Sequence, residues 1–177
     1  MHNVDVDRIE ETQRKAKDNP SVATLTVELK GDWRSNPHQK QFGGTVKFPE
    51  GEALFEADFP PFLGGEGRAP SPLMYCFYGA MCCYGATFAT QAAMAGVELK
   101  GLRIGLNLSV DFRTALGLGG FTPLSAFNFE VEVDTKASDE DVQRVKQLAD
   151  ERCPAIWAME NKVPYSTKAK RVKPAAA

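Results

Sequence analysis

One stretch of this sequence constrains its fold more than any other: residues 69–97 contain no charged side chain. Ser71 and Pro72 are typical of a helix start, because serine can accept unpaired backbone N–H groups and proline is tolerated at the first helical position. Gly96 suits the left-handed conformation that ends many helices. Small and apolar residues occur on every side of this predicted helix, which indicates a helix that is buried all round.

The same stretch has the length of a membrane span, but its glycines, threonines and glutamine keep its hydropathy modest. We therefore favour a central helix surrounded by protein. The whole chain of 177 residues is 43% hydrophobic and 25% charged, which is enough for one domain with a buried core. The first ten residues lack the features of a secretory signal, so a cytoplasmic protein with reduced cysteines is expected.

Strands are predicted on both sides of the helix, because apolar and polar residues alternate there. The alternating runs cover residues 22–30, 45–48, 53–59, 102–112, 127–133 and 163–167. A second helix is predicted to follow Ser138, whose next three residues are acidic, and a short helical turn is predicted after Cys153 and Pro154. The resulting element order predicts an α+β fold whose first three strands form an antiparallel meander.

The apolar helix also predicts an assembly. One meander of about six strands covers a single side of a helix, because a domain is built from packed layers. A helix that is apolar on all sides then requires a second sheet from another subunit. We therefore expect an obligate dimer with a shared core.

Composition argues against several functions. The net charge is −2, from 21 basic and 23 acidic side chains, so the chain lacks the basic balance of a nucleic-acid-binding protein. Its two histidines, His2 and His38, lie in polar stretches and are poor candidates for a metal site or a Ser-His-Asp relay. The glycine runs at 64–67 and 117–120 lack the spacing of phosphate-binding loops. We predict no metal, no organic cofactor, and neither a nucleic-acid nor a membrane partner.

The four cysteines have no spacing typical of a disulfide scaffold. For Cys76 and Cys82 we favour the role of small core hydrophobes. A soft-metal site at Cys82 and Cys83 is disfavoured, because adjacent side chains diverge on a helix. Cys153 stands directly before Pro154 and is predicted to begin a helix, where unpaired N–H groups favour a thiolate. From the residues alone, a structural and a reactive Cys153 are equally open.

Three short motifs follow one another along the chain. Residues 69–73 read Ala-Pro-Ser-Pro-Leu, a cysteine follows eleven positions after Pro72 in an apolar small-residue helix, and a distant Cys-Pro follows. This order and spacing resembles the OsmC/Ohr family of thiol-dependent peroxidases, as do the loop at 64–67 and the strand at 102–112. The resemblance covers about residues 24–167. With it we expect a polar N-terminal arm at 1–20, a single OsmC-like domain at 21–168 and a flexible tail at 169–177.

The resemblance implies a fold and a chemistry. The fold is an intertwined homodimer in which antiparallel sheets wrap central helices. Cys83 corresponds to the family's helix cysteine, which attacks an organic hydroperoxide as a thiolate and becomes a sulfenic acid. Cys153 corresponds to the cysteine that condenses with it to a disulfide. A thiol reductant, in related proteins a dihydrolipoyl group, resets the pair. The resemblance thus implies a peroxidase that acts in the response to oxidative stress.

A cation is also implied, because burial among apolar residues raises the pKa of a mid-helix thiol such as Cys83. The family uses an arginine from an early strand or loop; Arg34 is the nearest match and Arg68 the second. Members of the organic-hydroperoxide-resistance type hold this arginine with a glutamate right after the matching proline, where this chain has Leu73; Glu66 is the only nearby carboxylate. The substitution favours an alternative function, a non-catalytic OsmC-like dimer that binds a small apolar ligand near Cys83.

Overall fold

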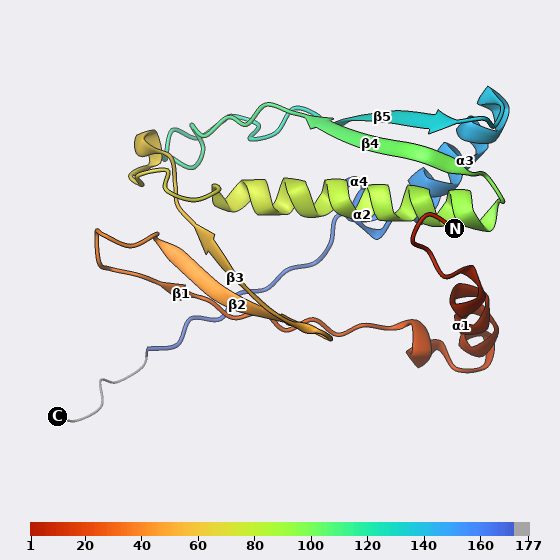
Figure 1. Cartoon of the computed structure of the whole chain (residues 1–177). Coiled ribbons are helices and arrows are strands. Elements are labelled where there is room, and N and C mark those ends of the chain that lie inside the picture. Colours follow the sequence, from red (N-terminus) through yellow and green to blue (C-terminus); the bar gives the residue numbers. More distant parts are fainter. Residues whose placement is uncertain (172–177) are drawn as a thin grey trace.

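The structure is a computed structural model that describes residues 1–171. Its central element is the helix α2 (Pro72–Met94), which lies between two antiparallel sheets (Figure 1). The helix begins with Pro72 at its first position, as predicted, although Ser71 makes no side-chain capping bond. It ends at Ala95, and Gly96 follows with a φ of 70°. A proline at the start and a glycine after the end therefore determine where this helix begins and stops.

The two sheets hold different parts of the chain. In the first, β2 (Phe42–Phe48) pairs with the short β1 (Asp32–Trp33) on one side and with β3 (Gly51–Ala57) on the other. The second sheet pairs β4 (Leu99–Asn107) with β5 (Asn128–Thr135). The predicted meander of about six strands is thus wrong, because the strands on either side of α2 form separate sheets.

The core forms where the C-terminal half of α2 meets β4, β5 and two further helices, α3 (Asp139–Arg152) and α4 (Pro154–Glu160). Ser138 caps α3 by accepting the backbone N–H of Asp141, as its position before an acidic turn predicts. The buried side chains of this core are those of Tyr84, Phe88, Ala92, Val97, Val145, Ala149 and Cys153. This packing fixes the C-terminal helices against α2, and the site described below lies inside it.

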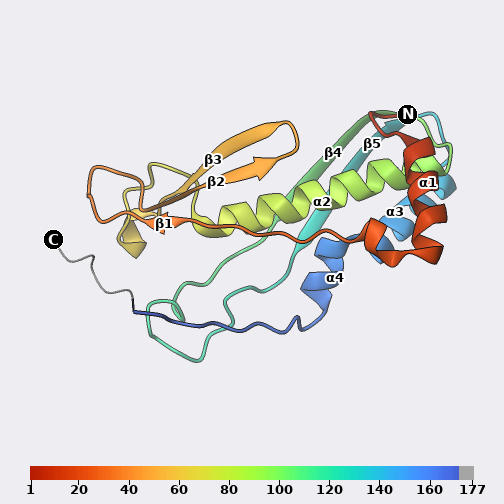
Figure 2. The same cartoon turned by 90° about the horizontal axis from the view of Figure 1, so that it is seen from below.

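The N-terminal arm leads to the first sheet along the outside of the molecule (Figure 2). It contains α1 (Val6–Asp18) and the 3₁₀ turn η1 (Pro20–Ala23), neither of which has a buried residue. A second 3₁₀ turn, η2 (Pro61–Leu63), follows β3. The expected polar arm at 1–20 thus includes a helix of 13 residues.

Two predicted strands do not form. Residues 24–30 have no strand partner among the residues that the structure describes, and Leu25, Val27 and Leu29 are 85%, 66% and 65% exposed. Residues 163–167 also remain outside any sheet. An alternating pattern predicts which side chains of a strand face the core. It does not predict whether another strand lies beside the segment to pair with it. The expected flexible tail falls largely at 172–177, outside the described residues.

The central helix is buried at its C-terminal end, where Gln91, Ala92 and Ala93 are all covered, but its N-terminal part is only partly covered. Its buried residues include Ala80, Tyr84 and Phe88, whereas Met74 and Tyr78 are 58% and 64% exposed. One chain therefore does not provide the all-round burial that the sequence indicates. In the described part of the chain, 1–171, no helix has both the length and the apolar character needed to cross a membrane.

Candidate active site

Two sulfur atoms from distant parts of the chain meet inside the core. The Cys153 thiol donates a hydrogen bond to Cys83 across 3.7 Å between the Sγ atoms. Cys83 lies on α2 and is half-buried, whereas Cys153 is fully buried at the junction of α3 and α4. A disulfide bond is about 2.05 Å long, so the two sulfurs need to approach by less than 2 Å to form one.

The junction presents Cys153 because a proline follows it. Proline cannot continue α3, since it lacks a backbone N–H and its ring clashes with the preceding turn. Cys153 accordingly ends α3 through its N–H bond to the Ala149 carbonyl and begins α4 by accepting the N–H of Trp157. The prediction that Cys153 begins a helix is confirmed. Its side chain makes no capping bond, however.

The surroundings of Cys83 favour its protonated form. Burial raises the pKa of the Cys83 thiol, and the neighbouring Cys153 raises it further, while a hydrogen bond from the Ala155 backbone N–H lowers it. The unpaired N–H group at the start of α4 therefore acts on Cys83, not on Cys153 as the sequence suggested. Within residues 1–171, no cation is among the groups that shift this pKa.

Arg34 directly follows β1 of the three-stranded sheet, which is separate from the β4–β5 sheet that packs on α2 near Cys83. Its Nη1 donates to Glu56 Oε1 at 2.5 Å, and Lys40 Nζ donates to Glu56 Oε2 at 2.8 Å. These partners, Lys40 first, lower the pKa of Glu56 below its ordinary value. Gly43 makes room for the arrangement, because a Cβ there would lie 2.5 Å from Arg34 Nη2. Arg34 is thus held by a carboxylate.

Glu56 was not found by sequence reasoning, although a signal existed. The β2–β3 turn pairs Phe48 with Gly51, and the same register places Glu56 opposite Gly43. A carboxylate facing a glycine leaves space for a long basic side chain across the strand. Arg34 therefore has a carboxylate partner in its own sheet, although position 73 is a leucine.

Arg68, the second candidate, is fixed in the loop before α2. Its Nη2 donates to the Pro37 carbonyl at 2.7 Å, and its backbone N–H donates to the buried carboxylate of Asp58 at 3.0 Å. Glu66 takes part in no ion pair within residues 1–171. The structure therefore brings Cys83 and Cys153 together. Arg34 and Arg68 instead bond other groups, Glu56 for Arg34 and the Pro37 carbonyl and Asp58 for Arg68.

The remaining two cysteines are exposed. Cys76 and Cys82 lie on faces of α2 that its own chain leaves uncovered, so one chain does not give them the core positions that the sequence favoured. Cys82 is a hydrogen-bond partner of Tyr78, and this bond is the main cause that raises the pKa of the tyrosine hydroxyl.

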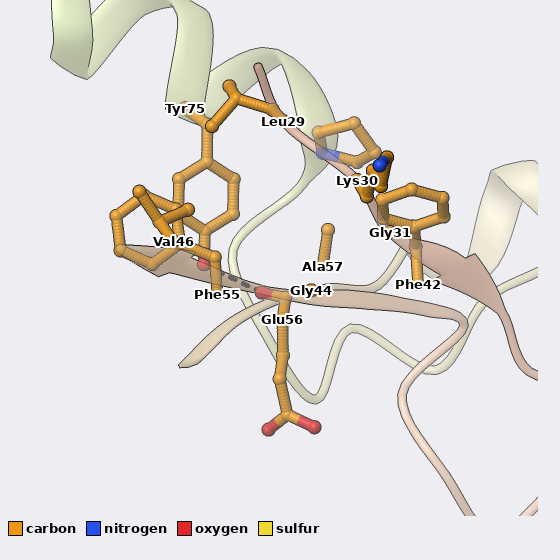
Figure 3. A pocket seen from close by; sticks show the side chains of 11 residues that line it. Leu29, Lys30, Gly31, Phe42, Gly44, Val46, Phe55, Glu56, Ala57 and Tyr75 are labelled. Carbon is orange, nitrogen blue, oxygen red and sulfur yellow. Dashed lines mark hydrogen bonds between the residues drawn. The ribbon is translucent and has the colours of Figure 1, made fainter. Parts of the chain in front are cut away.

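Two apolar cavities lie beside the N-terminal half of α2. The first, of about 300 Å³, opens between the three-stranded sheet, the segment 29–31 and Tyr75 (Figure 3). There the Tyr75 hydroxyl donates to the Glu56 carbonyl, while the Glu56 carboxylate points away from the apolar side chains. The second, of about 520 Å³, lies between α2 and β4 and includes Met74, Tyr78 and Leu106. Cys83 lines neither cavity.

Fold and site together define the class of protein: an α+β chain in which an apolar central helix and a helix junction bring two thiols together in a core closed by an antiparallel sheet. The model of the family described as OsmC-like protein matches residues 65–168, more than half of the chain. The chain belongs to the OsmC-like protein family. The resemblance found in the sequence and the predicted α+β, OsmC-like fold are confirmed.

Solved structures agree with this assignment. The OsmC like protein from Mycoplasma pneumoniae superposes with a TM-score of 0.59 at 15% sequence identity, over 77% of this chain and 88% of that chain. An organic hydroperoxide resistance protein OsmC from Legionella pneumophila superposes with a TM-score of 0.50 at 19% identity, over 77% and 91%. No curated protein matches the sequence. At these identities, the solved structures establish a shared fold.

Proposed function

We propose that this protein is a thiol-dependent peroxidase that reduces organic hydroperoxides through Cys83 and Cys153. The observation that carries the proposal is the 3.7 Å contact between the two sulfurs. The Cys83 thiolate attacks the hydroperoxide, the O–O bond breaks, and an alcohol leaves as Cys83 becomes a sulfenic acid. The Cys153 thiol then displaces water from that sulfenic acid to give the disulfide. An external thiol, a dihydrolipoyl group in related proteins, supplies the electrons that restore both thiols.

The direct test is a thiol count before and after one equivalent of an organic hydroperoxide. We expect the loss of two thiols per chain, with the new disulfide mapped by mass spectrometry to Cys83 and Cys153. The Legionella relative is named for organic hydroperoxide resistance, which supports this substrate class for the present chain. Unchanged thiols after exposure to the hydroperoxide would refute the proposed activity.

A homodimer is part of the proposal. Monomeric proteins rarely expose large continuous apolar surfaces, yet this chain exposes apolar side chains on α2, on the first sheet and on the extended segment before it. They include Leu25, Val27, Leu29, Trp33, Phe48, Leu54, Met74 and Tyr78. A second copy that covers them would complete the core around α2 and give residues 24–30 a partner.

We therefore predict a dimer in solution with twice the 19.4 kDa mass of the chain. Tyr78→Glu places a charge on the uncovered face of α2 and is expected to shift the equilibrium toward monomers, because an unpaired charge is costly to bury. Sedimentation at micromolar concentration measures both. A compact monomer of the unmodified protein at that concentration would contradict the prediction.

We further propose that Arg34 of one copy serves Cys83 of the other. Within its own chain, Arg34 directly follows β1 of the first sheet, whereas Cys83 lies eleven residues beyond the start of α2, in the core with α4. Eleven residues of helix extend about 16 Å. The carboxylate of Glu56 keeps the guanidinium in one place, which suits a cation that must meet a partner's thiolate.

This assignment predicts a change in pH dependence. An opposite charge within about 6 Å lowers a thiol pKa by about 1 unit or more. Arg34→Gln should therefore move the midpoint of Cys83 alkylation upward by about that much, because burial alone raises this pKa. The measurement is the alkylation rate of Cys83 against pH, followed by mass spectrometry.

Arg68→Gln is the matched control, since it removes the other candidate arginine, and its profile should coincide with that of the unmodified protein. The assignment to Arg34 would be lost if Arg34→Gln left the profile unchanged, and it would pass to Arg68 if only the control moved.

The alternative function is a non-catalytic dimer that binds a small apolar ligand. The two apolar cavities beside α2, of about 300 and 520 Å³, favour it, and their volumes suit small molecules. Neither includes Cys83, however, so the ligand would not lie against the thiol within a single chain. Ligand binding with no oxidation of Cys83 by any organic hydroperoxide would support this alternative.

A further inference from the structure

Two side-chain hydrogen bonds join α2 to the last turn of α3, next to the cysteine pair. The Tyr84 hydroxyl donates to Asp150 Oδ1 at 2.7 Å, and Arg152 Nη1 donates to Gln91 Oε1 at 2.7 Å. Tyr84 is 2% exposed and Gln91 7%, so both α2 partners are polar groups inside the core. We call these four residues the interhelical clamp.

The residues of the interhelical clamp lie close in sequence to the two cysteines. Tyr84 directly follows Cys83, and Asp150 precedes Cys153 by three residues, nearly one helical turn. Tyr84 and Gln91 are seven residues apart and share one face of α2, about 10 Å from each other along the helix. Two attachments at that separation oppose both sliding and rotation of the end of α3.

The local surroundings make the Tyr84–Asp150 bond hard to replace. Both oxygens of Asp150 accept a hydrogen bond, because Oδ2 accepts from Lys146 Nζ at 2.6 Å within α3. The Tyr84 ring packs against Phe129 of β5 with centroids 5.2 Å apart, so the hydroxyl is held where it is. A buried hydroxyl without a partner is destabilising, and a charged acceptor gives one of the stronger side-chain hydrogen bonds.

We propose that Tyr84 and Asp150, supported by Gln91 and Arg152, are positioning residues for the closure of the Cys83–Cys153 disulfide. Closure takes the sulfurs from 3.7 Å to about 2.05 Å, and the clamp sets the distance that remains. In the peroxidase the step is the attack of the Cys153 thiol on the Cys83 sulfenic acid, which forms the S–S bond and releases water. The inference rests on the cysteine pairing in the proposed function, but not on the peroxide.

The test measures disulfide formation without a peroxide. Purified full-length protein is equilibrated with glutathione and glutathione disulfide, and the oxidised fraction is determined by mass spectrometry after alkylation. In Tyr84→Phe, which keeps the ring and removes the hydroxyl, the equilibrium constant for disulfide formation should fall about tenfold, a shift of about 30 mV for a two-electron couple. Asp150→Ala should behave alike, whereas Asp150→Asn keeps an acceptor and should recover part of the loss.

The matched control is Lys146→Gln, which alters the outer contact of Asp150 and leaves the interhelical bond in place; its equilibrium constant should equal that of the unmodified protein. A purely structural role lowers the thermal unfolding midpoint of reduced and oxidised forms by the same amount and leaves the equilibrium constant unchanged. That result in Tyr84→Phe and Asp150→Ala would overturn the proposal. If Tyr84→Phe does not fold, the Asp150 variants provide the test. Equal equilibrium constants for disulfide formation in Asp150→Ala, Asp150→Asn and Lys146→Gln would also overturn the proposal.

A second arm separates this inference from the proposed function. With excess organic hydroperoxide, a displaced Cys153 reacts more slowly with the sulfenic acid, so the clamp variants should accumulate more sulfinic acid at Cys83 than the unmodified protein does. Clamp-dependent disulfide formation in the glutathione arm, with no reaction toward hydroperoxides, would retain the clamp and refute the peroxidase. No Cys83–Cys153 disulfide under either oxidant would refute both.

Discussion

Cys83→Ser is expected to abolish the consumption of organic hydroperoxides, while Cys82→Ser retains most of it. The two residues are neighbours on α2, but only Cys83 contacts Cys153 and receives the Ala155 N–H. Cys82 is exposed and points about 100° away around the helix. A serine hydroxyl is not ionised at neutral pH and cannot replace the thiolate as the nucleophile. A coupled or colorimetric assay of residual hydroperoxide provides the measurement.

The pair of variants controls for packing, because each exchanges one sulfur for one oxygen on the same turn of the same helix. Circular dichroism and thermal unfolding should show that both fold. Equal loss of activity in the two variants would mean that the reactive thiol is misassigned, or that the loss reflects a disturbed dimer.

Cys153→Ser is expected to change the product of oxidation completely. Without a second thiol, the Cys83 sulfenic acid has no partner inside the core and proceeds with excess hydroperoxide to sulfinic acid, which thiols do not reduce. The unmodified protein should instead stop at the disulfide and recover fully when a dithiol is added. Intact mass spectrometry distinguishes a gain of two oxygen atoms from a loss of two hydrogen atoms.

Cys76→Ser provides the comparison, since Cys76 is an exposed thiol that the pairing does not involve. It should give the same disulfide as the unmodified protein. Disulfide formation that persists in Cys153→Ser would show that another cysteine resolves Cys83, and the assigned pairing would then be wrong.

Much of the fold could be predicted because its signals are local. Pro72 and Gly96 mark the ends of α2, Ser138 caps α3, and Pro154 separates α3 from α4. Each acts through backbone geometry within a turn of its own position. The same locality explains the success at Cys153, whose place at a helix start depends only on the residue that follows it.

The predictions that fail, or that the sequence cannot make, depend on residues that are distant in the sequence. The alternation at residues 22–30 is real, but whether such a run becomes a strand depends on a neighbouring strand, and residues 1–171 offer none there. The sequence also cannot show that Tyr84 meets Asp150 or that Arg34 meets Glu56, because these pairs are 66 and 22 residues apart. The pairing of Cys83 with Cys153 came from resemblance, since periodicity within α2 says nothing about a residue 70 positions away.

In the proposed reaction cycle, the full burial of Cys153 determines which sulfur leaves first when the disulfide is reduced. Thiol exchange requires the incoming thiolate to approach a sulfur along the S–S axis, so access selects the sulfur that is attacked. Cys83 is half-buried and Cys153 is sealed inside the core. We therefore expect the reductant of the proposed cycle to form its mixed disulfide with Cys83, with Cys153 as the leaving group. In that cycle the thiol that closes the bond is the first to be regenerated, and the reductant remains attached to the sulfur that meets the next hydroperoxide until a second thiol releases it.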